Sequence, residues 1–148
     1  MATSAASSKS EPPLLVVVSG GGPVGLTFSL NLLTMMGNKV RIQIYEGRWF
    51  TDSTGSIVWQ GEDHGKIRRD QVVTLQDHVI AQMPFFVQNK LFSKINERVW
   101  PTSRNIPIRE VEDRLLDSIE PFVNSGLVEL IPENLNENSQ CLVTGEYL

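Results

Sequence analysis

The alternation of hydrophobic and polar positions divides the first third of the chain into a strand, a helix and a second strand. Leu14–Ser19 and Val40–Tyr45 are short runs of β-branched and aliphatic residues, typical of buried strands. Between them, residues 26–36 carry leucines at helical spacing, and Gly37 is suited to end that helix. Further apolar residues nearly encircle this helix, which predicts burial on more than one side. The order of elements predicts a βαβ unit and a parallel sheet.

The middle of the chain predicts irregular structure and then a short helix. Residues 47–65 are rich in turn-forming residues around the apolar patch 57–59, which indicates a long loop with one short strand or hairpin. Residues 75–83 predict a helix that stops at the following proline. Thr74 and Asp77 have the spacing of a capping box at its start.

The last third predicts one more helix and one more strand. Residues 85–101 are rich in aromatic side chains and predict an irregular cover over the core. Residues 109–122 repeat apolar positions on one helical face, and residues 127–131 read as the next strand. We therefore expect a disordered leader over residues 1–13 and one α/β domain over residues 14–148, with a Rossmann-like parallel sheet.

The turn between the first strand and the first helix has the form G-x-G-x-x-G. Gly20 is placed for a tight turn, Gly22 for close approach of backbone to a pyrophosphate, and Gly25 for close packing of helix on strand. The helix N-terminus then supplies free N–H groups and the positive end of a dipole. Glu46 ends the second strand 21 residues after Gly25, close to the spacing at which an acid meets a ribose hydroxyl.

The acid also bears on which ligand is expected. A carboxylate beside a 2′-phosphate would repel it, so FAD or NAD fits Glu46 better than NADP. A ligand-free turn between a buried strand and a core helix is the alternative, but it does not account for an acid at this distance. Glu46 by itself is also compatible with a solvated charge at a strand end.

Composition limits the remaining choices. The chain has 148 residues, 41% of them hydrophobic and 20% charged, which suits one soluble globular domain. A net charge of −4 and the lack of a long apolar run argue against nucleic-acid and membrane partners. The single cysteine, Cys141, favours a reducing, cytoplasmic setting. His64 has no Cys or His nearby at ligand spacing, so no metal site is expected. The sequence identifies no catalytic residue.

Three motifs together resemble a known family. They are LLVVVSGGGPVGL with Glu46-x-Arg48, then the segment RDQVV-x-L that begins at Arg69, then IPIR-x-VE, which contains Arg109. In this order, over residues 14–131, they resemble the amino-terminal part of FAD-dependent monooxygenases of the aromatic-hydroxylase type. That type includes the flavin domain of the actin-oxidising MICAL enzymes.

The resemblance implies an FAD-binding fold and a hydroxylation of a small organic substrate, with NADPH or NADH as electron donor and O₂ as oxidant. It implies that the glycines face the diphosphate, that the acid holds the adenosine ribose and that the arginines lie along the cofactor. The cofactor-binding residues expected on this basis are Gly20, Gly22, Pro23, Val24, Gly25, Glu46, Arg48, Arg69 and Arg109.

The family also has a second FAD motif and a substrate-covering sheet that these 148 residues do not show. We therefore expect a fold that is incomplete relative to the family. The chain is compatible with a truncated gene product, with a fragment, or with one piece of a split enzyme in which a second chain is the partner that completes the flavin site. Two other functions stay open from sequence. One is a non-catalytic dinucleotide-binding or interaction module, and the other is a nicotinamide-dependent reductase that uses the same βαβ unit.

Overall fold

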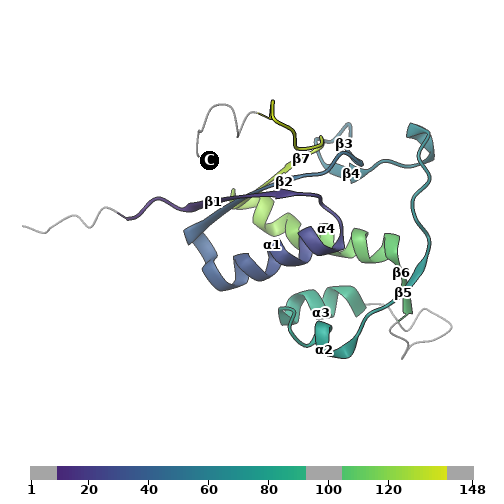
Figure 1. Ribbon diagram of the computed structural model, residues 1–148, viewed down its shortest axis with the longest axis horizontal. Coiled ribbons are helices and arrows are strands. Elements are labelled where there is room, and N and C mark those ends of the chain that lie inside the picture. The colour runs from purple at the N-terminus through teal and green to yellow at the C-terminus, as the bar shows by residue number, and fades with distance from the viewer. Residues whose placement is uncertain (1–9, 93–104, 140–148) are drawn as a thin grey trace, which may run out of the picture.

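The computed structural model describes residues 10–92 and 105–139, and these form a mixed α/β fold (Figure 1). Its main sheet has three parallel strands in the order β1-β2-β7, namely β1 (Leu14–Ser19), β2 (Val40–Tyr45) and β7 (Val128–Ile131). Ser19 is in register with Tyr45, and Tyr45 with Ile131. The carboxyl ends of the three strands thus lie in one row at one edge of the sheet. All three predicted strands are confirmed.

Two long helices cover one face of this sheet, as Figure 1 shows. They are α1 (Pro23–Met36), which connects β1 to β2, and α4 (Ile108–Asn124), which precedes β7. Both helices contact each other and the sheet. The core between them consists of fully buried aliphatic side chains from every layer, among them Leu26, Leu30, Ile42, Ile44, Leu115 and Ile119.

The outer face of α1 differs from the prediction. Leu26, Leu30 and Leu33 are buried as expected, but Val24 is 85% exposed and Met35 83% exposed. Within the described residues, this helix is therefore buried on one side only. None of the helices in the described ranges is long and apolar enough to cross a membrane.

The remaining elements are short. They comprise η1 (Gly37–Lys39), an antiparallel hairpin of β3 (Trp49–Thr51) and β4 (Ile57–Trp59), η2 (Glu62–His64), an antiparallel pair of β5 (Val72–Thr74) and β6 (Asn105–Pro107), α2 (Asp77–Ile80) and α3 (Phe85–Phe92). The hairpin expected in the long loop is confirmed.

The capping box predicted ahead of α2 is wrong. Gln76 is the N-cap residue of α2 and makes no side-chain capping bond. Thr74 belongs instead to strand β5, and its hydroxyl lies 2.6 Å from the amide oxygen of Asn105. Because Thr74 is committed to the β5–β6 pair, the helix begins later and is only one turn long.

The aromatic stretch after α2 also differs from the prediction. Residues 85–92 form helix α3, with Val87 and Leu91 fully buried against α4 one turn apart. That i, i+4 pair was a helical signal, but the four aromatic residues of the wider stretch obscured it. The rest of that stretch and most of the predicted leader lie outside the described residues.

The one-sided burial of α1 gives a direct stability test. Leu30→Ala removes a fully buried side chain and should cost about 2–5 kcal/mol of unfolding free energy, measured by urea denaturation. Met35→Ala on the same helix removes an exposed one and should stay within about 0.5 kcal/mol of wild type. Similar losses in both variants would mean that the outer face of α1 is covered after all.

Candidate functional site

The turn between β1 and α1 contains two glycines whose predicted structural roles are confirmed. Gly20 has a φ of +107°, which disfavours any residue with a Cβ, and its N–H donates to the carbonyl oxygen of Tyr45 at 2.8 Å. A Cβ on Gly25 would collide with the carbonyl oxygen of Gly20 and lie 3.2 Å from Cγ1 of Val18. Gly20 therefore makes the turn, and Gly25 lets α1 pack closely on β1.

Gly21, between the motif positions, is a third glycine that the fold requires. A Cβ there would overlap the ring of Trp49, which is 1% exposed, and would lie 2.9 Å from Cβ of Glu46. Sequence reasoning missed this role, because the ring that excludes a side chain comes from a strand 28 residues away.

Gly22 is different from the other three glycines of the turn. It is the N-cap residue of α1, with φ −74° and ψ −173°, a conformation that any residue adopts. The nearest atom to a Cβ added at this position would be Nη2 of Arg48 at 3.4 Å, an ordinary van der Waals distance to the end of a flexible side chain. Neither backbone conformation nor packing within the described chain requires glycine at this position.

The N-terminus of α1 is suited to an anion. Pro23 occupies the first turn, no acidic side chain lies there, and no side chain caps the helix. The first N–H groups of an α-helix have no partner within the helix, and the helix dipole adds partial positive charge at this end. Val24 is exposed beside these groups. A phosphate or carboxylate placed here would meet backbone donors directly.

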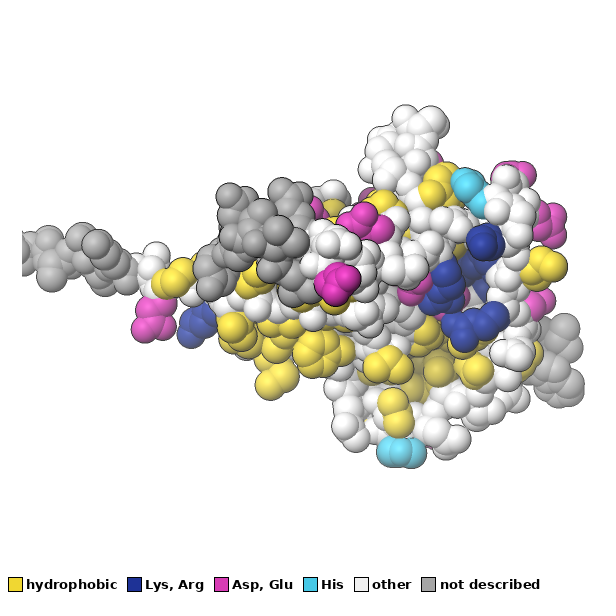
Figure 2. Space-filling model, turned by 45° about the horizontal axis from the view of Figure 1, so that its top comes forward, with side chains coloured by type: hydrophobic (Ala, Val, Ile, Leu, Met, Phe, Trp, Pro, Cys, Tyr) yellow, Lys and Arg dark blue, Asp and Glu magenta, His cyan; other side chains and the backbone are white. Residues whose placement is uncertain are grey.

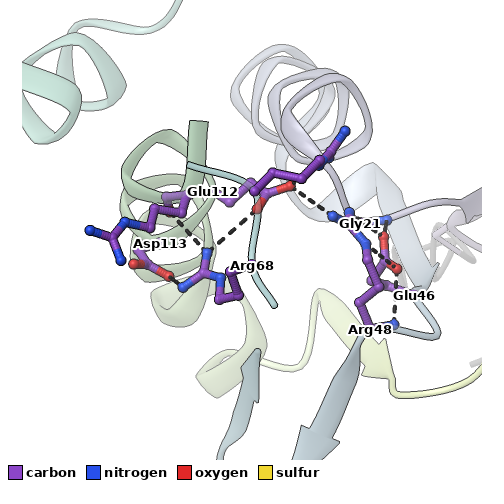
Figure 3. A network of polar contacts seen from close by, with 8 residues as sticks. Gly21, Glu46, Arg48, Arg68, Glu112 and Asp113 are labelled. Carbon is purple, nitrogen blue, oxygen red and sulfur yellow. Dashed lines mark hydrogen bonds and ion pairs between the residues drawn. The ribbon is translucent and has the colours of Figure 1, made fainter. Parts of the chain in front are cut away.

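Glu46 follows β2 and joins the glycine turn to Arg48. Its carboxylate accepts hydrogen bonds of 3.0 Å from the Gly21 N–H and from the backbone N–H, Nε and Nη2 of Arg48 (Figure 3). A carboxylate offers about four lone-pair positions, so these four bonds occupy its acceptor capacity. In this structure, Glu46 is satisfied entirely by the protein.

These contacts shift the pKa of both partners. Burial raises the pKa of the Glu46 carboxyl, but the hydrogen bonds and positive charge of Arg48 together with the Gly21 N–H outweigh it, and the net pKa is lowered. The pKa of Arg48 is raised, chiefly by its hydrogen bond with Glu46. Glu46 therefore stays ionised and Arg48 stays charged near neutral pH.

Glu112 of α4 is the second centre of the network. Its side chain is 2% exposed and accepts from Nη1 of Arg48 at 3.0 Å, Nη2 of Arg69 at 3.1 Å and Nη2 of Arg68 at 3.4 Å. Figure 3 shows this carboxylate between the Arg48 side and the Arg68 side of the network. The buried charge thus ties the end of β2 and the segment before β5 to α4.

Sequence reasoning missed Glu112, although a signal was present. The residue precedes Leu115 by three positions and Ile119 by seven, so it lies on the buried face of α4. An acid on an apolar helical face needs a cationic partner, because an unpaired buried charge is costly. The sequence holds 13 Lys and Arg residues, and the structure shows that Arg48, Arg68 and Arg69 are the partners.

Arg48, Arg68 and Arg69 line a cavity of about 340 Å³ together with Lys66, Trp59 and Glu112. The Cζ atoms of Arg48 and Arg68 lie 4.8 Å and 5.2 Å from the ring centroid of Trp59, within cation–π range. Figure 2 shows dark-blue Lys and Arg side chains gathered in a hollow of the surface. Glu112 lies in the lining, and Glu46 and Asp113 pair with two of the arginines from outside it, so the four cations leave a small positive excess beside the ring of Trp59. The cavity therefore suits an anionic or aromatic ligand.

Arg109 is set apart from this cluster. Its Nε lies 2.9 Å from a carboxylate oxygen of Asp70, and its side chain is 51% exposed. In the structure Asp70 supplies the anion beside this cation at the start of α4. Of the predicted residues, the structure brings the glycines, Glu46, Arg48 and Arg69 together. Arg109 touches the network through its backbone carbonyl, which accepts from Nη2 of Arg68 at 3.0 Å.

The described residues contain no group of three or more His, Cys, Asp and Glu side chains that could hold a metal ion. Comparison of the chain with family models, with curated proteins and with solved structures found no match.

The lowered pKa of Glu46 predicts how stability depends on pH. A carboxyl whose folded-state pKa lies below its ordinary value of 4.5 contributes stability above that value and loses it as pH falls through the folded pKa. Glu46→Gln should therefore be less stable than wild type by a constant amount between about pH 5 and 7. The difference should shrink below about pH 4.5, as measured by urea denaturation across pH. A pH-independent difference would contradict the ion pair.

Proposed function

We propose that the turn, the N-terminus of α1 and the Glu46–Arg48 pair bind the diphosphate and adenosine ribose of an adenine dinucleotide, in a Rossmann-like βαβ unit. The observation that carries the proposal is Gly22. Turn geometry or packing requires glycine at the three neighbouring positions, and neither requires it at Gly22, which is the N-cap residue of α1. Its place at the helix N-terminus, beside Arg48 and at the carboxyl edge of a parallel sheet, is where such sheets bind ligands.

The ribose contact requires an exchange of partners. Glu46 has no acceptor position left for a hydroxyl while Arg48 makes three bonds to it. A ribose hydroxyl that donates to Glu46 therefore displaces at least one Arg48 donor. Arg48 already reaches Glu112 through Nη1, and its guanidinium adjoins Gly22, so the released donors are placed to meet the diphosphate. In this proposal Arg48 holds the acid in position before binding and the phosphate afterwards.

We further propose FAD as the dinucleotide. Arg48 lines the arginine-rich cavity and also lies next to Gly22. A ligand that extends from Gly22 into this cavity, and is longer than one nucleotide, therefore passes cationic side chains. The ring of Trp59 in that lining offers an aromatic surface. Support also comes from the resemblance of the motifs containing Arg48, Arg69 and Arg109 to FAD-dependent monooxygenases.

Bound FAD would supply the redox chemistry, with NADPH or NADH as electron donor and O₂ as oxidant for hydroxylation of an organic substrate. The residues of this chain would do the binding. Gly22, Val24 and Gly25 would present N–H groups, Glu46 would fix the ribose, and the cavity arginines would balance negative charge. A second chain that completes the flavin site belongs to this proposal. Binding without catalysis, or binding of NAD instead, are the competing outcomes.

Gly22→Val tests the proposed site while leaving the fold intact. The β-branched side chain fits the backbone conformation but stands between backbone and diphosphate. Valine is a poorer N-cap residue than glycine, so we expect the unfolding free energy to fall by no more than about 1 kcal/mol. Affinity for FAD and for ADP-ribose should fall by at least about tenfold, or 1.4 kcal/mol. Isothermal titration of both proteins with FAD, ADP-ribose and NAD provides the measurement.

Gly61→Val is the matched control, because a Cβ at Gly61 has no atom within 4 Å and that residue lies outside the turn. It should bind as wild type does. Unchanged FAD affinity in Gly22→Val would remove the diphosphate assignment. If wild type binds NAD and FAD with equal affinity, the assignment of a dinucleotide site stands, but the assignment of FAD as its ligand is overturned.

A further inference from the structure

A second cavity, of about 530 Å³, lies between the β3–β4 hairpin and the outer side of α4. Its volume falls within the roughly 300–1,000 Å³ range of ligand-binding pockets. One wall is the continuous segment 55–59, which includes all of β4, and apolar side chains of the lining include Leu116 and Val123 of α4 and Leu130 of β7. The proposed dinucleotide site does not use this groove, although Trp59 and Arg68 border both cavities.

Within residues 10–92 and 105–139, the strand that forms this wall has one free edge. The N–H of Gln60 donates to the carbonyl of Arg48, and the N–H of Asp52 donates to the carbonyl of Ser56. These two bonds mark 48/60 and 52/56 as hydrogen-bonded pairs of the hairpin. By the alternation of antiparallel ladders, Ile57 and Trp59 direct their N–H and C=O groups away from β3. Among the described strands, β4 pairs with β3 alone. Ile57 and Trp59 therefore offer backbone donors and acceptors to an added strand.

The helix side of the groove is acidic. Asp113, Asp117 and Glu120 line it, at the i, i+4 and i+7 positions of one face of α4. Asp113 pairs with Arg68 at 2.7 Å, and Asp117 has Lys90 at 3.8 Å. In the described part of the chain, no cation lies within ion-pair distance of Glu120, which is exposed. Negative charge thus concentrates at the end of the groove away from Arg68.

We propose that this groove binds an extended basic segment of a partner protein by adding it as a strand to β4. The backbone of Ile57 and Trp59 bonds the segment, and apolar side chains on one of its faces contact Leu116 and Val123. Basic side chains next to them pair with Asp117 and Glu120. Charge complementarity selects the occupant, because an acidic segment would meet like charge at Asp117 and Glu120.

A fluorescein-labelled peptide of alternating valine and arginine residues serves as the probe, followed by fluorescence anisotropy with the full chain. A peptide of alternating valine and glutamate with the same label is the comparison. The arginine peptide should bind and the glutamate peptide should bind at least about tenfold more weakly. Amide exchange of Ile57 and Trp59, followed by NMR, should slow when the arginine peptide is bound.

The double variant D117N/E120Q should weaken binding of the arginine peptide by about 3- to 10-fold, the scale of two partly exposed ion pairs. Its matched control is E62Q/D63N, which removes the same charge from exposed residues of η2 and should change affinity by less than about twofold. Melting curves of both variants verify folding.

The proposal would be overturned by no binding of the arginine peptide, by equal affinity for the two peptides, or by equal losses in the two double variants. Binding without protection of Ile57 and Trp59 would refute strand addition. None of these measurements involves a dinucleotide, so the result stands apart from the proposed function.

Discussion

The ionised carboxylate of Glu46 is the contact on which the arrangement of the site depends. It lies at the end of the central strand and is 9% exposed, so its charge has to be met by donors within the protein. The Gly21 N–H and three donors of Arg48 meet it. The turn after β1 is thereby fixed to the end of β2, and Arg48 is held beside Gly22.

Glu112 imposes the same requirement on helix α4, because it is a second buried carboxylate that needs cationic partners. Arg48 bonds both carboxylates, and Arg68 and Arg69 add positive charge around the more deeply buried one. Arg48 and Arg69 are 44% and 52% exposed at their side chains, so solvent screens these pairs and each contributes little to stability on its own. These pairs instead fix the positions of the side chains, since three guanidinium groups contact the buried carboxylate of Glu112.

Much of the fold could be predicted from sequence because its signals are local. The valine and isoleucine runs of β1 and β2, the leucines of α1 and the glycine turn each report on their own neighbours along the chain. Thr74 shows where local reasoning fails. Its spacing from Asp77 suits a capping box, but pairing with Asn105, 31 residues away, places it in a strand. The sequence contains no local signal for that pairing.

The candidate site was predictable in part for the same reason. The glycines and Glu46 follow a spacing rule, whereas the exclusion of a side chain from Gly21 by Trp49 and the convergence of arginines on Glu112 arise only from tertiary packing. The saturation of Glu46 by Arg48 could not be read from spacing at all. It changes the expected role of the acid, because the ribose contact now has to compete with an internal partner.

An NMR titration of ¹⁵N-labelled chain with ADP-ribose tests the central claim most directly, because it observes the donors themselves. We predict that the amide signals of Gly22, Val24 and Gly25 shift together with the Nε–H signal of Arg48, as this side chain leaves Glu46 for the diphosphate. Saturable binding that leaves these four signals unmoved, or no binding at millimolar ligand, would contradict the proposed site.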